Sequence, residues 1–165
     1  MSFTWEEFVK THARAALDAA LRVVANAADA EDVVQEVFLE IFKGDQLSKF
    51  AGQPALLRTL ATRRALDRLR KKKSACRIDQ RDTVGREHEP SDYAVAAELD
   101  QRLRKSLAEL PPREAEVFCL SVFEGYSPSE IAAVLGISRG AIAKSLCLAR
   151  TRLSIAFRNT SEVEQ

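Results

Sequence analysis

The stretch SPSEIAAVLGISRGAIAKSL, residues 127–146, decides the fold of the C-terminal half of the chain. Its first four residues, 127–130, combine an N-cap serine, a proline at the first helical position and a glutamate that completes a capping box. Gly136 ends this short helix, and Ser138 can cap a longer one that runs through Phe157. A short helix, a glycine-containing turn and a longer helix predict a helix-turn-helix rather than an ordinary αα-hairpin.

Small and apolar residues support this prediction. Ala132, four residues before the turn glycine, lets the two helices approach closely. A small core between them is expected from Ile131, Leu135, Ile137 and Ile142. With Ile142 and Leu146 turned inward, the outward and flanking faces of the second helix, Leu148 included, can meet a DNA major groove. The candidate DNA contacts are Ser138, Arg139, Ala141, Lys144, Ser145 and Arg150. Arg150 and Arg152 could reach DNA phosphates, although a solvated helix end explains these two residues equally well.

Upstream of this unit, residues 92–110 predict an amphipathic helix, and residues 113–125 predict another after a Pro-Pro break. The segment 74–91 loses hydrophobic periodicity and has the composition of a linker. Before it, residues 55–73 are strongly helix-forming and 44–54 predict a loop. The expected fold is therefore all-α: two small helical domains joined by a linker, the C-terminal one containing the helix-turn-helix. The domains span residues 1–73 and 92–160, with a linker at 74–91 and a tail at 161–165.

The N-terminal half begins with a capping box at 4–7 and a helix that runs through Ala25. Residues 26–28 then interrupt the helix, and Asp29 can cap a second helix over 29–43. Apolar residues recur in that helix as pairs every four positions, which places them on one side. They are Val33, Val34, Val37, Phe38, Ile41 and Phe42.

The opposite side of the 29–43 helix is polar and mostly acidic, with Glu40 at its edge. Leu39 is a lone leucine within it, and we interpret it as a candidate anchor for a partner protein. Scattered exposed leucines are normal in soluble proteins, so a simple solvated face is the alternative. The candidate protein-binding residues are Asp32, Gln35, Glu36 and Leu39.

Charge is segregated along the chain although the net charge is only +1. Residues 25–45 carry six acidic side chains against one lysine, whereas residues 58–73 carry eight basic side chains against one aspartate. Each block alone has a solvated helix face as its simplest explanation. Together, the two blocks suggest two different partners.

Composition narrows the functional classes. The 165 residues are 46% hydrophobic and 30% charged, with only 6 Gly and 5 Pro, which favours a mostly helical globular protein. No apolar run is long enough for a membrane span and the N-terminus is acidic, so we expect a cytoplasmic protein without membrane insertion. Cys76, Cys119 and Cys147 form no metal or disulfide pattern and are expected to be reduced structural thiols. His12 and His88 belong to no catalytic or metal constellation, so neither a cofactor nor an enzyme is expected.

At this point the order of parts resembles the extracytoplasmic-function (ECF) sigma factors, the small two-domain bacterial members of the sigma-70 family. DAEDVVQEVFLEIFK (29–43) is similar to the helix that docks on the clamp helices of the RNA polymerase β′ subunit. ATRRALDRLRKKK (61–73) looks like the minus-10 helix, and residues 110–138 look like the minus-35 domain. The resemblance implies an initiation subunit that binds core polymerase, through the β′ clamp helices and the β subunit, and promoter DNA.

The resemblance also implies site residues. It assigns core polymerase binding to the acidic face around Leu39, and minus-35 binding to the helix-turn-helix residues given above. For the minus-10 element, it implies Arg63, Arg64, Arg68, Arg70, Lys71 and Lys72. It leaves open whether an anti-sigma factor holds the protein inactive.

Some positions depart from the family pattern. The family often has Trp where Leu56 stands and Asn where Arg63 stands. Its Lys-Ser-Arg run in the recognition helix appears here as residues 143–145, ending in Ser145, and Leu148 replaces a common basic residue. We expect these differences to alter base capture at the minus-10 element and to weaken phosphate contacts at the upstream element.

Two other functions compete with this one. A stand-alone helix-turn-helix regulator would normally dimerise to bind two half-sites, and it leaves the acidic helix unexplained. A helical adaptor or anti-factor that binds only proteins explains the acidic face but leaves the basic run RLRKKK at 68–73 unexplained.

Overall fold

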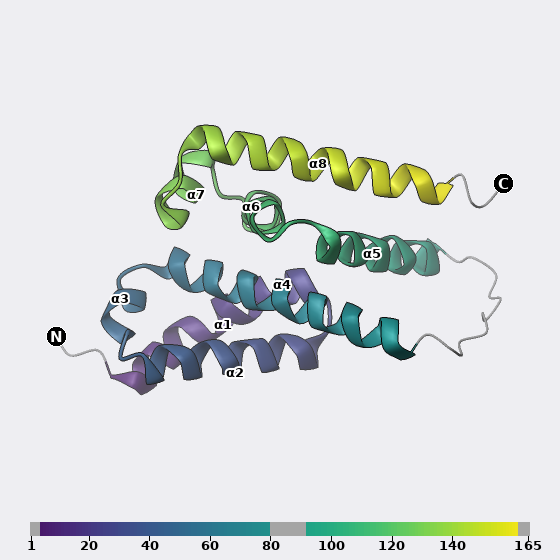
Figure 1. Cartoon of the computed structure of the whole chain (residues 1–165). Helices are drawn as coiled ribbons and strands as arrows, with labels where there is room; N and C mark the ends of the chain where they lie inside the picture. The colour runs from purple at the N-terminus through teal and green to yellow at the C-terminus, as the bar shows by residue number, and fades with distance from the viewer. Residues whose placement is uncertain (1–3, 80–91, 162–165) are drawn as a thin grey trace.

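The computed structural model describes residues 4–79 and 92–161, and all regular structure in these two ranges is helical (Figure 1). The all-α prediction is therefore confirmed. The helices are α1 (Trp5–Val24), α2 (Ala27–Lys43), α3 (Leu47–Ala51), α4 (Pro54–Asp79), α5 (Asp92–Glu109), α6 (Pro112–Val122), α7 (Pro128–Leu135) and α8 (Arg139–Ser161).

Two helix starts form as their sequences predict. The Thr4 hydroxyl accepts the Glu7 N–H at 3.3 Å, and the Glu7 carboxylate accepts the Thr4 N–H at 2.9 Å. Ser127 and Glu130 make the same reciprocal pair at the start of α7, at 3.3 and 2.7 Å. The backbone hydrogen bonds lower the pKa of both glutamates, because they favour the charged carboxylate.

The helix-turn-helix is also present as expected. Gly136 ends α7 in the left-handed conformation, with φ of 66°, and the Ser138 hydroxyl accepts the Ala141 N–H at 3.1 Å to cap α8. Five buried residues form the core of this unit: Val117, Leu120, Ile131, Ile142 and Leu146. Leu135 and Ile137 pack against this core partly buried. The unit thus includes α6 as its third helix.

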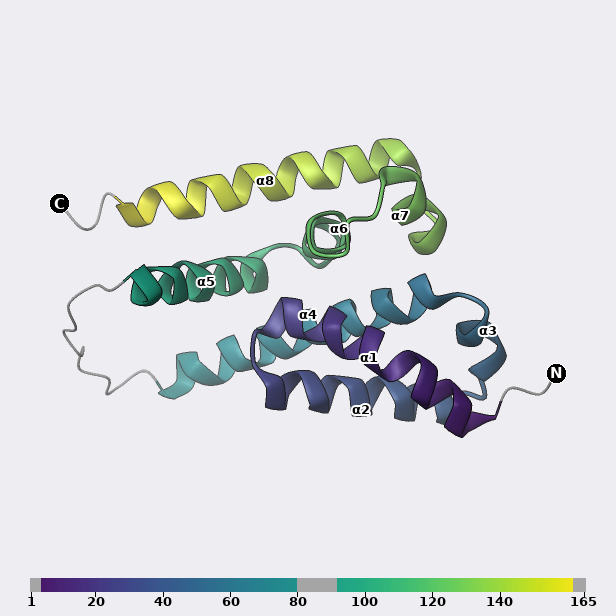
Figure 2. The same ribbon diagram turned by 180° about the vertical axis from the view of Figure 1, so that it is seen from behind.

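The first half is a bundle of α1, α2 and α4, in which each helix contacts the other two. Figure 2 shows α1 in front of α4, with α2 along the lower side. Small residues are frequent in the buried core of α1 and α4: Ala16, Ala20, Ala61 and Ala65 are all fully buried. Short side chains allow helices to pack closely, and larger buried residues such as Phe8, Leu57 and Leu66 belong to the same core.

The second half packs on the first through α4. In both views α6 is seen nearly end-on, between α4 and α8, while α5 lies along the C-terminal part of α4 (Figures 1 and 2). One hydrophobic cluster contains residues of both halves, including Leu57 and Leu66 of the first and Leu107, Ala115 and Cys119 of the second. The two halves therefore share a core.

Three local predictions need correction. Asn26, not Asp29, caps α2: its side-chain oxygen accepts the Asp29 N–H at 3.0 Å. The expected loop at 44–54 contains α3, which forms because Phe50 is buried against the bundle. The expected linker is helical at its start, because α4 continues to Asp79. No Gly or Pro stands between Pro54 and Asp79, so loss of periodicity alone did not end the helix.

The rest of the predicted linker, with His88, lies outside the described residues, and the division into domains at residue 73 stays a prediction. Among the described residues no single helix is long and apolar enough to cross a membrane; only α7 and α8 taken together, bent by 109°, meet that length and composition.

The three cysteines differ in environment. All are free; Cys119 is buried in the shared core, whereas Cys76 and Cys147 are exposed. Burial raises the pKa of the Cys119 thiol to about 12. The expectation of structural thiols therefore holds for Cys119 alone.

The turn of the helix-turn-helix offers a matched pair of glycines. Gly136→Ala should lower the free energy of unfolding by about 1–2 kcal/mol, because a Cβ is strained at positive φ. Gly140→Ala, where an added Cβ meets only the Ser138 hydroxyl at 3.9 Å, should leave it equal or raise it by about 0.5 kcal/mol. Urea unfolding of the full chain measures both, and equal losses from the two variants would contradict the assigned turn.

Candidate functional site

Helix α4 carries basic side chains toward two different neighbours. Arg64, Arg68 and Lys72 follow one another at four-residue spacing and face α2. Arg64 donates to Glu40 from Nε at 3.0 Å and from Nη2 at 2.5 Å. Four ion pairs continue along the same helix contact: Arg68 with Asp29 (3.3 Å), Asp32 (2.5 Å) and Glu36 (3.6 Å), and Lys72 with Asp29.

The acidic and basic blocks of the sequence thus face each other. From the sequence we expected two separate partners for these blocks, but in this fold α2 and α4 pack side by side and each block neutralises much of the other. The linear charge pattern contained no information on this pairing, which joins residues 24 to 43 positions apart.

Asp29 is the most enclosed carboxylate of this contact. The residue is 7% exposed and accepts hydrogen bonds from both Lys72 and Arg68. The hydrogen bond from Lys72 lowers the pKa of Asp29 more than burial raises it. Because Asp29 stands in the first turn of α2, it joins the start of α2 to the last third of α4.

Other basic side chains of α4, among them Arg63 and Lys73, face the second half of the protein. Arg63 donates to Glu116 of α6 from Nε at 2.9 Å and from Nη2 at 2.6 Å. Lys73 contacts Glu109 of α5 at 2.7 Å. Arg70 pairs within its own helix, with Asp67 at 3.3 Å.

Lys71 differs from the other predicted minus-10 residues. The structure shows no ion pair or hydrogen bond for this exposed side chain in the described part of the chain, whereas the other five are all paired. A DNA phosphate would compete with a carboxylate at each of those five residues but not at Lys71.

The acidic face of α2 is assembled as predicted. Asp32, Gln35, Glu36 and Leu39 are all exposed, and Leu39 is 54% exposed to solvent. Its neighbours Asp32 and Glu36 turn toward Arg68, so the acidic part of the face is already partly neutralised. The assignment of this face to polymerase stays a prediction.

Sequence reasoning missed a groove beside this face. Phe42 was expected to point inward, but it is 61% exposed and packs on Trp5, with ring centroids 5.0 Å apart. The two rings close one end of a groove of about 600 Å³ between α1 and α2. Its lining is almost entirely apolar: Trp5, Val9, Ala13, Val34, Gln35, Phe38, Leu39 and Phe42. Helix periodicity gave the correct side of α2 for Phe42 but not the extent to which the neighbouring helix covers it.

The predicted minus-35 residues lie along the first half of α8. Ala141, Lys144 and Arg150 are exposed and Ser145 is half-buried. Ser138 is the helix cap, and Arg139 donates to the Ser129 hydroxyl of α7 at 2.5 Å. These contacts fix the start of α8 against α7. Arg152, also considered for phosphate binding, pairs instead with Glu114 of α6 at 3.0 Å.

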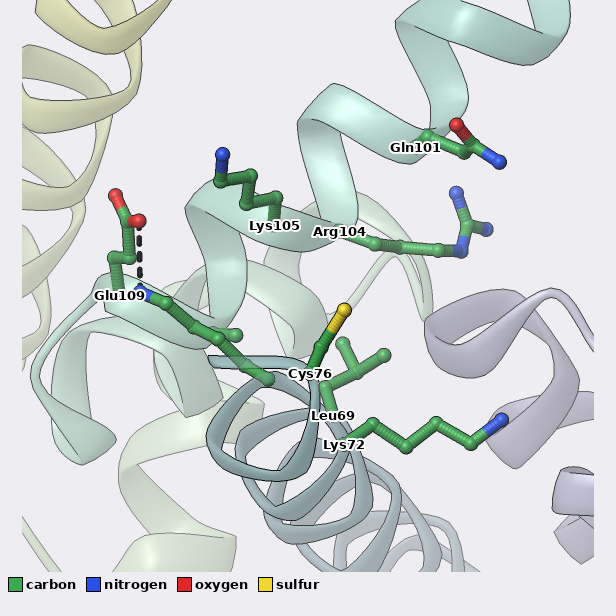
Figure 3. Close-up of a pocket in the computed structure, with 9 residues that line it drawn as sticks. Leu69, Lys72, Cys76, Gln101, Arg104, Lys105 and Glu109 are labelled. Atoms are coloured by element: carbon green, nitrogen blue, oxygen red, sulfur yellow. Dashed lines mark hydrogen bonds and ion pairs between the residues drawn. The ribbon is translucent and has the colours of Figure 1, made fainter. Parts of the chain in front are cut away.

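A further pocket lies between the end of α4 and α5, lined by Lys72, Lys73, Cys76, Arg104 and Lys105 among others. Figure 3 shows that the charged ends of Lys72 and Lys105 point in different directions. Lys73 pairs with Glu109, and Arg104 with Asp100. The cations therefore do not converge on a place where an anion would bind.

No cluster of metal-ligating side chains is found within residues 4–79 and 92–161. His12 lies buried against the ring of Phe8, with centroids 4.8 Å apart, and its pKa is lowered by that burial. This histidine is part of the bundle core.

The comparisons with known proteins agree with this arrangement. Residues 8–75 match the family model of sigma-70 region 2, and residues 100–153 match the model of sigma-70, region 4. The ECF RNA polymerase sigma factor SigL of Mycobacterium tuberculosis is 32% identical over 130 residues, covering 77% of this chain and 73% of SigL. The chain belongs to the ECF sigma factors of the sigma-70 family. Its region 2 comprises α1 to α4, and its region 4 lies within α5 to α8.

A further relative and a solved structure are similar to this chain, the latter in fold alone. The ECF sigma factor SigE of Mycolicibacterium smegmatis is 28% identical over 98% of this chain, which spans 65% of the length of that relative. The sigma factor RpoE of Bartonella quintana, solved with the anti-sigma factor NepR, has the same fold, with a TM-score of 0.55 at 21% identity over 93% of this chain and 96% of RpoE.

The contact of Asp29 with α4 should make stability depend on pH. A carboxyl with a depressed folded pKa stabilises the native state above its unfolded pKa of about 3.9, and this contribution is lost as the pH falls through the folded value. Asp29→Asn should therefore unfold at lower urea than wild type at pH 7, and the difference should shrink below about pH 4.

Asp32→Asn is the control for that experiment, because the Asp32 side chain is 52% exposed and its pair with Arg68 should contribute less. Equal losses for the two variants, or a loss for Asp29→Asn that stays constant down to pH 3, would contradict the role of Asp29.

Proposed function

We propose that this ECF sigma factor binds core RNA polymerase through α2 and directs it to promoters through α4 and the helix-turn-helix. The observation that carries the proposal is the exposed face of α2, where Leu39 stands among acidic side chains on the same chain as a helix-turn-helix. A regulator that worked without polymerase would not need this second surface. The partners are the β′ clamp helices and β subunit of polymerase, and promoter DNA.

The apolar part of the polymerase contact extends beyond Leu39. Leu39 and Gln35 belong both to the acidic face and to the α1–α2 groove, so the two surfaces are continuous. Binding energy at protein interfaces concentrates in a few large apolar anchors surrounded by polar contacts. We assign the anchors to Leu39 and Phe42, and the polar surroundings to Asp32 and Glu36.

On the DNA side, we assign Lys71 to a phosphate contact. We assign the other predicted minus-10 residues to contacts that form when DNA phosphates replace their carboxylate partners. One small module binds DNA nonspecifically with a Kd of only about 10⁻⁴ to 10⁻⁶ M. Tethering a second module gives it an effective concentration on the order of millimolar. The minus-10 and minus-35 contacts thus act together although each is weak.

Upstream recognition is assigned to the start of α8. Arg139 has the planar fork that can bind guanine O6 and N7 together, a contact that gives about 1–3 kcal/mol of discrimination. Its hydrogen bond to Ser129 holds the guanidinium at the start of the recognition helix. Lys144 lies exposed farther along the helix and can reach a base or a phosphate.

These assignments describe a binding subunit, and no catalytic step is assigned to its residues. We expect it to act in the cytoplasm, with polymerase. An anti-sigma factor is a further partner to test, since the similar fold of RpoE from Bartonella quintana was solved with NepR.

Core binding tests the proposal directly. Leu39→Ala and Phe42→Ser should each weaken binding to core polymerase about 30-fold, as expected for loss of an anchor contributing about 2 kcal/mol. Glu36→Lys should weaken it as well. Pull-down with core polymerase measures binding, and runoff transcription from genomic fragments selected with the holoenzyme measures function.

The matched control is Leu21→Ala, which truncates another exposed leucine, 39% open, near the end of α1 and outside the groove. Circular dichroism should show unchanged helicity in all four variants. Normal core binding by Leu39→Ala, Phe42→Ser and Glu36→Lys would place the polymerase contact elsewhere.

Lys71 gives a separate test of the DNA assignment. Lys71→Ala should reduce the dependence of log K on log salt by about 0.9 for duplex DNA, or about 0.7 for single strands, because one phosphate contact is lost. The measurement is holoenzyme binding to promoter DNA from 50 to 200 mM salt. Lys10→Ala, which removes a lysine paired with Glu6 on α1, should leave the slope unchanged. An unchanged slope for Lys71→Ala would remove Lys71 from the contacts.

A further inference from the structure

Arg139, at the start of the recognition helix, is held by a different kind of partner from the arginines of α4. Its Nη2 donates to the Ser129 hydroxyl of α7 at 2.5 Å, and within the described residues it forms no ion pair with a carboxylate. Arg63 and Arg64, by contrast, are bound to glutamates. A neutral hydroxyl leaves the charge of Arg139 uncompensated, so its guanidinium stays available to an acceptor on DNA.

The hydrogen bond to Ser129 leaves enough donors for a base. A guanidinium has five N–H groups in one plane, and the hydroxyl accepts from one of the two on Nη2. Whichever of these two it takes, one paired edge of the fork remains free, either Nη1 with Nη2 or Nε with Nη2. A paired edge is what binds guanine O6 and N7 together. Ser129 can therefore fix the plane of the fork without blocking the base contact.

Ser129 is itself held in place by the structure around the turn. It is the second residue of α7, whose start is fixed by the reciprocal hydrogen bonds of Ser127 and Glu130, at 3.3 and 2.7 Å. Ile131 of α7 and Ile142 of α8 are fully buried in the core of the helix-turn-helix, and Figure 1 shows α7 beside the start of α8. The hydroxyl therefore has a fixed position relative to the recognition helix.

Arg139 has little else to restrain it. It is the first residue of α8, its side chain is exposed, and its neighbour Gly140 has no side chain. Fixing a long, freely rotating side chain on a base costs conformational entropy, and a partner that orders the side chain beforehand reduces that cost. The Ser129 hydroxyl supplies this ordering.

We propose that Ser129 is a positioning residue for upstream promoter recognition, whose hydroxyl orients the Arg139 fork toward one guanine of the minus-35 element. The inference rests on the proposed function, which assigns Arg139 to a base. Because Ser129 belongs to the first helix of the helix-turn-helix, promoter preference depends on both helices. Loss of the hydroxyl frees the fork but leaves the charge of Arg139 in place, so it lowers discrimination among bases more than it lowers affinity.

The experiment measures base preference with holoenzyme made from core polymerase and the full chain. The probe is a promoter that the wild type selects from DNA with a randomised upstream region, tested with every other base at each upstream position. Ser129→Ala should lower the preference for guanine at one position about two- to tenfold, the range expected for one lost hydrogen bond. Ser129→Thr should keep the preference, whereas Ser129→Val, which has the same shape without a hydroxyl, should lose it.

A matched control tests whether loss of any serine that binds an arginine has this effect. Ser154 accepts a hydrogen bond from Arg158 at 3.3 Å, but it lies about 22 Å farther along α8 than Arg139, at 1.5 Å per residue. Ser154→Ala should therefore keep the wild-type base preference. Ser129→Ala should also keep the wild-type dependence of log K on log salt, because no charge is removed.

Arg139→Ala separates positioning from a direct contact of Ser129 with DNA. This variant should abolish the guanine preference at the position that Ser129→Ala affects. When Ser129→Ala is added to Arg139→Ala, no further change is expected, because a positioning residue acts only through the side chain that it positions. Urea unfolding of the free variants should give the wild-type midpoint.

The inference alone is overturned if Arg139→Ala changes the guanine preference while Ser129→Ala and Ser129→Val do not. A further loss on adding Ser129→Ala to Arg139→Ala would also overturn it, since Ser129 would then act on DNA by itself. A wild-type preference for Arg139→Ala would refute the base contact that the proposed function assigns to Arg139, and the inference with it.

Discussion

Helix α4 carries basic side chains on almost every side and contacts helices of both halves of the protein, so its positive charges need nearby carboxylates. Its neighbours provide the compensation: Glu40, Asp32 and Asp29 on α2, and Glu116 and Glu109 on the second half. Where these carboxylates are enclosed, removing one would leave a partly desolvated cation without a partner, at a cost well above that of an exposed pair. The positions of α2 and α6 are thus tied to the order of basic residues along α4.

Local features of the fold could be predicted because their partners lie within four residues. The capping boxes at 4–7 and 127–130, the stop at Gly136 and the cap at Ser138 all form as their sequences indicate. The pairing of acidic with basic blocks could not be predicted, because it depends on which helices become neighbours. Helix α3 was missed for a related reason, because it depends on burial of Phe50 against the bundle. The extension of α4 was missed because loss of periodicity does not end a helix where neither Gly nor Pro interrupts it.

The candidate site shows the same division. Periodicity assigned Asp32, Gln35, Glu36 and Leu39 to one exposed face of α2, since a helix face is a local property. It did not show that Phe42 stays exposed, because the coverage of a side chain depends on how neighbouring helices pack. Nor did it show that five of the six basic residues assigned to the minus-10 element have carboxylate partners within the chain.

Arg63 connects the family pattern to this chain's own structure. The family often has asparagine at this position, and an asparagine side chain has neither the charge nor the reach of a guanidinium fork. The departure from the pattern is therefore the residue that binds Glu116. A guanidinium fork makes charge-assisted hydrogen bonds to carboxylate and to phosphate alike, so Arg63 can bind either group. A phosphate that binds Nε and Nη2 of Arg63 must displace Oε1 of Glu116, which now accepts from both of these nitrogens.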